Sequence, residues 1–335
     1  MSGHTSTPMQ AEIRGVRVRS VGRGRAEVLP LRLWRFAPLL TGTGVALTLL
    51  TAAFLVGVLL DPREVMGAPR WLKPAKFAIS TGIYALTFAW MLTHVRGRPT
   101  LVRWAGRITA WVLVVEVGLI ALQAGRGTTS HFNQTTLLNG WITATTGVAI
   151  LALWVMSIAV AVALLRQPFT DRALAASLRS GLWITIAGAA VGIYMATPSA
   201  EQWQTLRSGV RPDYIGAHSV GGVDGGPGLT AVGWSTEHGD LRVAHFVGLH
   251  AMQVIPLVGW WLARRGASQR RRLALVRVAA ASYAGLVAIA LVQALRAQPV
   301  TRPDAWTLGL VLFWAALTVA AVRHARAPEA GWATT

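Results

Sequence analysis

The sequence predicts an all-α bundle of about eight transmembrane helices with both chain ends in the cytoplasm. Composition is the first reason: 53% of the 335 residues are hydrophobic, only 13% are charged, and the mean hydropathy is +0.47. A soluble protein of this length carries more charge. The other two reasons are recurring long apolar windows and a one-sided distribution of arginine, and together they predict a polytopic membrane protein.

Eight apolar windows recur along the chain. A helix needs about 20 residues to cross the hydrocarbon core, and each window with its flanks reaches or approaches that length. The second, fifth and eighth windows are short, and Glu116 interrupts the third. The windows are 36–60, 77–93, 108–123, 141–165, 182–197, 243–263, 273–295 and 306–322.

Basic residues are concentrated in alternate connections between these windows. With the amino terminus in the cytoplasm, the cytoplasmic segments hold 22 of the 32 basic residues and the outer segments hold 10. Short loops rich in Lys and Arg remain in the cytoplasm. We therefore expect an Arg-rich cytoplasmic tail (1–35), a transmembrane domain (36–322) and a second cytoplasmic tail (323–335). Because the arginines are dispersed over loops and tails, no nucleic-acid partner is expected.

The amino-acid composition indicates where the protein is located and excludes several kinds of functional site. The basic residues are almost all arginine, and Ala and Val are abundant, which is typical of GC-rich bacteria and favours the bacterial cytoplasmic membrane as the location. The absence of cysteine excludes disulfides, thiolate metal sites, iron–sulfur clusters and covalently attached haem. No nucleotide-binding loop and no hydrolase motif is present.

The longest connection covers residues 198–240 and is expected outside the membrane without clear secondary structure. Its centre, 221–228, is rich in glycine, which permits unusual backbone angles. Loops of this length act as lids over a site or are disordered spacers. Both readings stay open, and the first predicts that residues 221–228 border the entrance of a cavity.

Five histidines fall in the outer half of the protein. His238 and His245 are seven residues apart and share one helical face, whereas His250 lies about 140° around the helix from His245. The other two are His131 and His218. Imidazole ligates metals and haem iron and relays protons. The structural alternative is a neutral histidine that hydrogen-bonds between helices.

Glu116 is the one carboxylate inside a predicted span. Burial in lipid is costly for a charged group, so Glu116 is expected to be protonated, paired with a cation or bound to a metal. Its position between Arg107 and Arg126 places it near the membrane centre, at a depth comparable with that of His250. We therefore predict that Glu116 and His250 belong to one site, with Gln123 on the same face of the helix as Glu116.

The segment that opens the second span contains both lysines of the protein. Lys76 and Tyr84 recur at helical spacing, with Lys73 just above them, which makes a polar stripe that enters the membrane. The ammonium groups could bind a lipid phosphate, another anion or the charge of Glu116. Equally, interfacial lysines can be anchors that extend to the membrane surface.

These residues predict one outward-facing polar cavity. The first hypothesis is a metal or haem site for redox or metal-dependent chemistry, in which His245 and His250 bind the cofactor with His131 or His238, and Glu116 and His250 act in catalysis. The alternatives are a proton- or ion-coupled small-molecule transporter and a lipid-modifying enzyme, so the expected partners are the lipid bilayer and a small-molecule or lipid substrate. The predicted lining is Lys73, Lys76, Tyr84, Glu116, Gln123, His131, His238, Asp240, His245 and His250.

Overall fold

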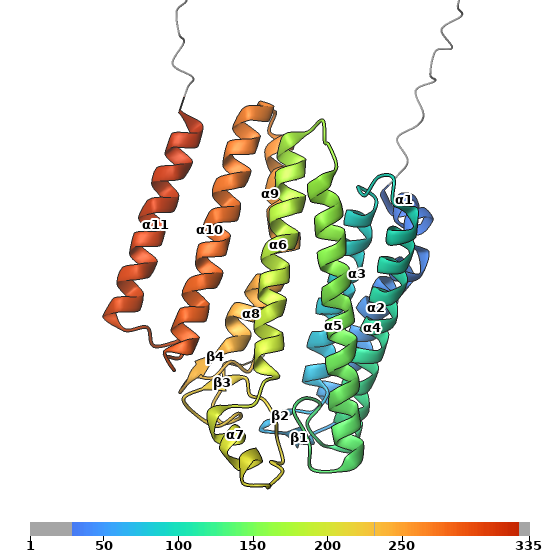
Figure 1. The fold of residues 1–335 in the computed structure, drawn as a ribbon, viewed down its shortest axis with the longest axis vertical. Helices are drawn as coiled ribbons and strands as arrows, with labels where there is room; N and C mark the ends of the chain where they lie inside the picture. The colour runs from blue at the N-terminus through green and yellow to red at the C-terminus, as the bar shows by residue number, and fades with distance from the viewer. Residues whose placement is uncertain (1–28, 231, 328–335) are drawn as a thin grey trace, which may run out of the picture.

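The computed structural model describes residues 29–230 and 232–327, which form a helical bundle (Figure 1). Seven long helices and one bent helix pair have the length and hydropathy of membrane spans, and each predicted window falls on one of them. The long helices are α2 (Pro38–Leu60), α3 (Leu72–Leu92), α4 (Pro99–Arg126), α5 (Leu137–Arg166), α6 (Arg172–Met195), α10 (Gln269–Leu295) and α11 (Ala305–Arg326), and the bent pair is α8 (Leu241–Leu249) with α9 (Ala251–Arg264).

Short polar side chains set the beginnings of most spans. Each accepts a hydrogen bond from a backbone N–H of the first turn, which would otherwise lack a partner. Pro99 starts α4, where its missing N–H costs nothing. Gly127, with φ of 71°, ends α4 in the left-handed conformation that glycine adopts without strain. The capping residues are Thr136 for α5, Asp171 for α6, Asp240 for α8, Ser268 for α10 and Asp304 for α11.

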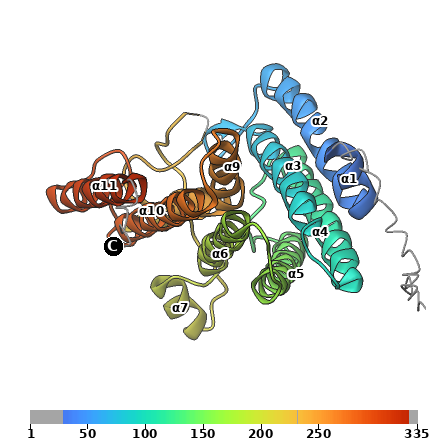
Figure 2. The same cartoon turned by 90° about the horizontal axis from the view of Figure 1, so that it is seen from above.

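The helices pack largely in chain order. Helices α2, α3, α4, α5 and α6 each contact the next, and α6 then contacts α8, α9 and α10. Figure 2 shows this arrangement along the bundle axis, with α11 at the edge. Helix α11 packs on α10, and Thr307 is its one buried residue. The main apolar core, which includes Phe88, Leu113 and Leu178, lies among α3, α4, α5 and α6.

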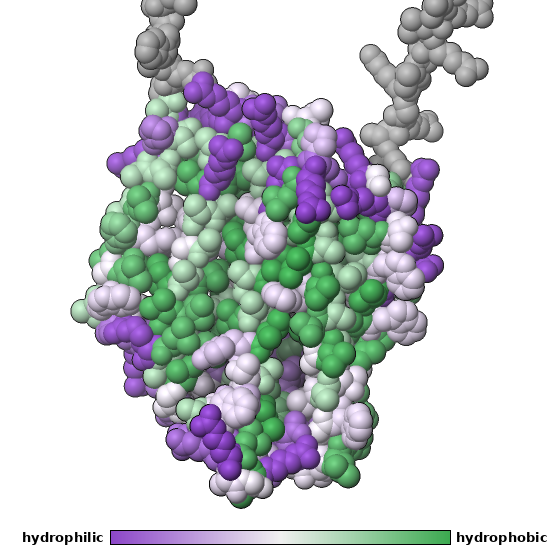
Figure 3. Space-filling view, in the orientation of Figure 1, coloured by the Kyte–Doolittle hydropathy of each residue, from purple (hydrophilic) through white to green (hydrophobic). Residues whose placement is uncertain are grey.

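The two ends of the bundle differ in charge and structure. Helix α1 (Leu29–Phe36) and the last turn of α11 lie at the same end, where hydrophilic side chains gather, while hydrophobic side chains cover the sides of the helices (Figures 1 and 3). We call this the arginine-rich end. With the bent pair counted as one span there are eight candidate crossings, and this even number brings the first and last described helices to the same end, as predicted. Residues 29–35 of the predicted tail form α1 instead, and residues 1–28 and 328–335 lie outside the described residues.

The opposite end is covered by a folded connection, residues 196–240, which we call the cap. The prediction that this connection has no clear secondary structure is wrong. It contains α7 (Ala200–Arg207), held by a capping box between Ser199 and Gln202, and the antiparallel pair β3 (Ser219–Val220) and β4 (Gly239–Asp240). Beside it lies a hairpin of β1 (Glu64–Val65) and β2 (Ala68–Pro69).

Helices α6 and α8 touch through their backbones. A Cβ atom on Gly188 would lie 2.7 Å from the backbone of Gly248, so neither position has room for a side chain. Just beyond this crossing, the chain bends by 42° between α8 and α9 at His250. The hydroxyl of Thr185 donates to the carbonyl of Leu249 (3.1 Å) and accepts from the N–H of Met252 (3.0 Å). Thr185 thereby satisfies backbone groups that the bend exposes.

Candidate functional site

A chain of three polar side chains lies at the capped end of the bundle. Oε1 of Glu116, in α4, is 3.2 Å from Nε2 of His131, and Nδ1 of the same ring is 3.2 Å from Nζ of Lys73, in the first turn of α3. The hydroxyl of Ser130 also contacts Nδ1, at 2.8 Å. An acid, an imidazole and a cation therefore form a continuous path from inside a membrane span to its end.

Within this chain of three side chains, Glu116 is an acid and His131 is a neutral base. Glu116 is 2% exposed, and its Oε2 has no hydrogen-bond partner among the described residues, which is unusual for a buried oxygen. Burial and the neighbouring Lys73 ammonium lower the pKa of the His131 imidazole, although Glu116 opposes them. His131 is thus neutral at neutral pH. With one ring proton it can donate from Nε2 to Glu116 and accept at Nδ1 from Lys73 or Ser130.

Local backbone geometry turns His131 back toward Glu116. The loop starts at Gly127 in the left-handed conformation, and Phe132 also has a positive φ, 63°. This conformation costs a non-glycine residue on the order of 1–3 kcal/mol and is found most often at functional sites. The Gln123 amide donates to the carbonyl of Thr129 and to Asn139 Oδ1 (3.1 Å each), which ties the loop to α4 and α5.

The cap is bonded directly to this loop. Gln134 N–H donates to the carbonyl of Asp213 (2.7 Å), and Ile215 N–H donates to the carbonyl of Phe132 (2.9 Å). The His218 ring lies 4.8 Å from that of Phe132, between centroids. Movement of the cap must therefore disturb the loop that carries His131.

A second histidine–carboxylate pair organises the cap itself. Asp224 accepts from the N–H groups of His218 and Ser219 and contacts His218 Nδ1 at 2.8 Å. Burial lowers the pKa of His218 to about 4, although Asp224 opposes it. Burial acts to raise the pKa of Asp224, but the His218 ring and the two N–H groups outweigh it and lower that pKa below its usual range. Asp224 lies within the predicted glycine-rich segment, 221–228, and binds that segment to the start of β3.

Two cations hold the second half of the cap. Nζ of Lys76 donates to the carbonyl of Val232 (3.1 Å), and Nη2 of Arg242 donates to the carbonyl of Gly233 (2.6 Å). Arg242 also pairs with Asp240, whose side chain is fully buried, at 2.6 Å. Asp240 therefore neutralises Arg242, whereas the partner of the Lys76 ammonium is a carbonyl oxygen, which carries only a partial negative charge.

The structure gives Glu116 a different partner from the predicted His250. The hydrogen-bonding partner of Glu116 is His131, and His250 lies at the bend between α8 and α9. Helical spacing predicts both residues at mid-membrane, but the chain bends by 42° at His250, where α9 begins and packs on α6. His245 is also directed at α6, where its Nδ1 lies 2.8 Å from the carbonyl of Gly188 and its ring fills the space beside Gly192.

Three other predicted residues have structural surroundings. The Tyr84 hydroxyl contacts Ser157 Oγ at 3.0 Å and joins α3 to α5. Gln123 belongs to the loop-binding network described above. The His238 ring packs against Gly222 inside the cap and lies 3.8 Å from Glu237. Among the described residues, none of the three forms a hydrogen bond or ion pair with Glu116, His131 or Lys73.

The predicted metal site finds no support in residues 29–230 and 232–327. Within them, no three His, Asp or Glu side chains are grouped as metal ligands would be. His131, His238 and His245 were the predicted ligands, and each has another neighbour: Glu116, Gly222 and Gly188 respectively. Haem binding by His245 and His250 stays a prediction.

Sequence reasoning missed two residues of the site. A serine next to a histidine in a polar loop is common, so the sequence gives Ser130 no distinguishing signal. Asp224 lies in the glycine-rich segment, where an acid six residues after His218 in an extramembrane loop is an available signal. Comparison with known proteins gives no match, whether with family models, curated proteins or solved structures.

Proposed function

We propose that this chain is a proton-coupled membrane transporter in which Glu116, His131 and Lys73 carry the proton. The observation that supports this most directly is the unbroken contact from Lys73 through His131 to a carboxyl group inside a span. An ionisable group at membrane depth is costly and is typically retained for an ion or proton pathway.

The proposed proton step uses both nitrogens of one neutral imidazole. Lys73 gives a proton to Nδ1 of His131, and the ring releases its Nε2 proton to the Glu116 carboxylate. Lys73 ends neutral, Glu116 ends protonated, and His131 has changed tautomer. The proton arrives at Oε1 of Glu116, which contacts Nε2, and Oε2, which has no hydrogen-bond partner among the described residues, remains available as an acceptor.

We further propose that the transported solute is an anion. Lys76 binds the carbonyl oxygen of residue 232, and a carboxylate or phosphate would bind its ammonium group more strongly because it carries a full charge. Binding of the anion would therefore release this part of the cap. Since the cap is bonded to the His131 loop, its release would couple solute binding to the proton path.

Proton uptake by proteoliposomes tests the proposal. A trapped pH-sensitive dye should report uptake that depends on one anion from a panel of carboxylates and phosphate esters. Glu116→Gln and His131→Phe should abolish anion-dependent uptake, because neither replacement can carry the proton. Glu201→Gln, in exposed α7, is the matched control and should behave as wild type. Wild-type uptake by Glu116→Gln would refute the proposal.

The Ser130 contact favours a second candidate, a membrane-embedded hydrolase or transferase. Ser130, His131 and Glu116 have the order of hydroxyl, base and orienting acid that activates a serine nucleophile. A fluorophosphonate probe should then label the wild type and not Ser130→Ala. In the transporter, Ser130→Ala should retain anion-dependent proton uptake, so probe labelling and proton uptake of this one variant together separate the two functions.

A further inference from the structure

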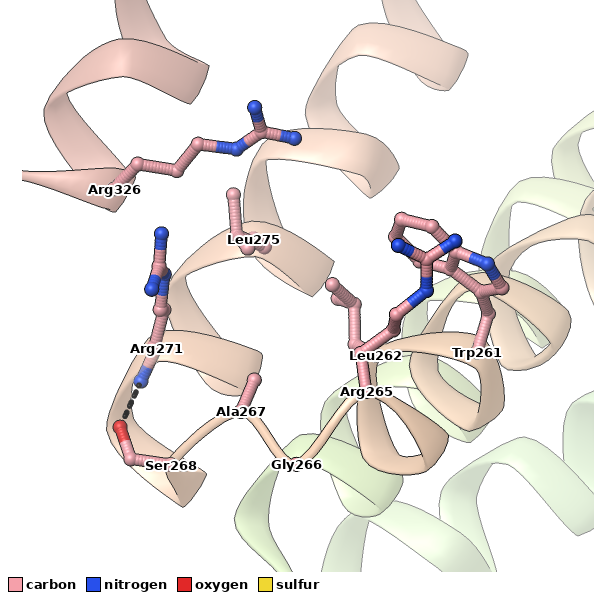
Figure 4. A pocket seen from close by; sticks show the side chains of 9 residues that line it. All are labelled: Trp261, Leu262, Arg265, Gly266, Ala267, Ser268, Arg271, Leu275 and Arg326. Atoms are coloured by element: carbon pink, nitrogen blue, oxygen red, sulfur yellow. Dashed lines mark hydrogen bonds between the residues drawn. The ribbon is translucent and has the colours of Figure 1, made fainter.

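A cavity opens at the arginine-rich end, between the ends of α9, α10 and α11 (Figure 4). It has a volume of about 410 Å³ and lies at the opposite end of the bundle from Glu116 and the cap. Three arginines from the three helix ends line it: Arg265, Arg271 and Arg326. Buried Leu262 and Leu275 form its apolar floor.

The positive charge of this cavity is not neutralised by the described residues. Arg265 stacks over the Trp261 ring at 4.6 Å, and the guanidinium groups of Arg271 and Arg326 have no acidic partner within residues 29–230 and 232–327. Their neighbour Arg272 differs, because it pairs with Asp171 at 2.6 Å. Three guanidinium groups around one cavity form a site for an anion with several oxygens.

The position of the cavity identifies the source of the anion. Trp260 and Trp261 are exposed on the same turn of α9, and tryptophan at the end of a span is typical of the headgroup level of a membrane. Arg264 and Arg265 lie over these two rings. The arginines of the cavity are therefore at the height of lipid phosphates.

An apolar surface continues from the cavity toward the membrane interior. Helices α9 and α11 both pack on α10, and the exposed apolar side chains that precede the arginines along these helices are Leu257 on α9 and Leu317 and Val319 on α11. The exterior of α11 is almost wholly unburied by protein. A ligand with a phosphate at one end and hydrocarbon at the other matches both parts of this surface.

We propose that this cavity binds the headgroup phosphate of an anionic phospholipid. Inorganic phosphate shares the headgroup chemistry but has no hydrocarbon to contact the apolar surface. Arginines in cytoplasmic loops also serve to orient the protein in the membrane, whether or not they bind lipid. Arg103 is exposed near the start of α4 at the same end but does not line the cavity. It therefore provides the matched control for the loss of one orienting positive charge.

Native mass spectrometry of the purified full chain tests the proposal. The protein is titrated separately with phosphatidylglycerol, phosphatidylcholine and inorganic phosphate. We expect phosphatidylglycerol to bind more tightly than phosphatidylcholine. Arg271→Gln and Arg326→Gln should each weaken phosphatidylglycerol binding about fivefold, corresponding to about 1 kcal/mol per charge, and Arg103→Gln should not weaken it.

Three results would overturn the proposal. The first is equal affinity of the wild type for the two lipids. The second is a loss in Arg103→Gln as large as in Arg271→Gln, which would indicate a general charge effect. The third is displacement of phosphatidylglycerol by an equal concentration of inorganic phosphate, which would indicate a free-anion site. Because Arg271 and Arg326 are exposed, their variants should keep the wild-type Tm without lipid, and each single variant tests the site alone.

Discussion

Oε1 of Glu116 lies 3.2 Å from Nε2 of His131, although fifteen positions separate the two residues and one of them is inside a membrane span. The contact gives the buried carboxyl a polar partner that can donate or accept a proton. It also explains why α4 tolerates an acid in an otherwise apolar window, since an unpartnered buried carboxylate is far more costly than a paired one.

The first prediction concerns the energetic coupling of this pair. His131→Phe leaves Glu116 without its partner, so combining it with Glu116→Gln should cost less than the sum of the single changes, by about 1–3 kcal/mol in the free energy of unfolding. The control cycle uses Glu116→Gln with His250→Ala, and its effects should add to within about 0.5 kcal/mol. Denaturant unfolding in detergent measures both cycles, and equal coupling in the two would contradict the assigned partner.

The second prediction concerns the crossing of α6 and α8. Gly188→Ala puts a methyl group 2.7 Å from the Gly248 backbone, so the helices must separate. We expect a loss of about 1–3 kcal/mol of stability, as for overpacked cores. Gly147→Ala in α5 meets nothing within 4 Å and should instead leave stability unchanged or raise it by up to about 1 kcal/mol. Thermal unfolding distinguishes these opposite signs.

The spans could be predicted from the sequence because a membrane imposes a local requirement. About 20 apolar residues suffice to identify a crossing, and every predicted window lies on a long helix or on the bent pair of α8 and α9. The cap could not be predicted in this way. Its order depends on single polar contacts, such as Asp224 with His218, that join residues through turns and have no periodic pattern.

The partner of Glu116 could not be predicted because it lies outside the helix. The depth of Glu116 along α4 predicted a partner at the same depth in another span, and His250 is such a residue. The actual partner reaches Glu116 through a loop whose path depends on Gly127, on the positive φ of Phe132 and on the hydrogen bond from Ile215. The sequence did contain a sign that the helix around His250 is not straight. Pro256 lies inside the following helix, and a proline there removes a backbone hydrogen bond and favours a kink.

The third prediction concerns the orientation of the bundle. Positive loops remain in the cytoplasm, so the arginine-rich end should face inward and the cap outward. The chain has no cysteine, which allows single-cysteine labelling. In intact bacterial cells a membrane-impermeant maleimide should label Val223→Cys, which is 85% exposed in the cap, and should label exposed Thr170→Cys only after permeabilisation. The reverse pattern would contradict the orientation.

The fourth prediction is that acid loosens the cap. Burial lowers the pKa of His218 to about 4 from an ordinary value of about 6.5, so the folded cap favours the neutral ring. The resulting stabilisation is fully present above pH 6.5 or so and is lost as the pH falls toward 4, because the unfolded segment binds the proton first. Asp224 stays charged across this window since its own pKa is below the usual range, and the nearby Lys73 and Arg242 disfavour the imidazolium.

Hydrogen exchange measures this loosening at the amides that Asp224 binds. The N–H groups of His218 and Ser219 should lose protection between about pH 6.5 and pH 4, after correction for the intrinsic pH dependence of exchange. His218→Gln removes the titrating ring, so protection in this variant should vary little over the same range. His324→Gln, at the arginine-rich end, should respond to pH as the wild type does. If amide protection in His218→Gln falls with pH as it does in the wild type, then a group other than His218 controls the cap.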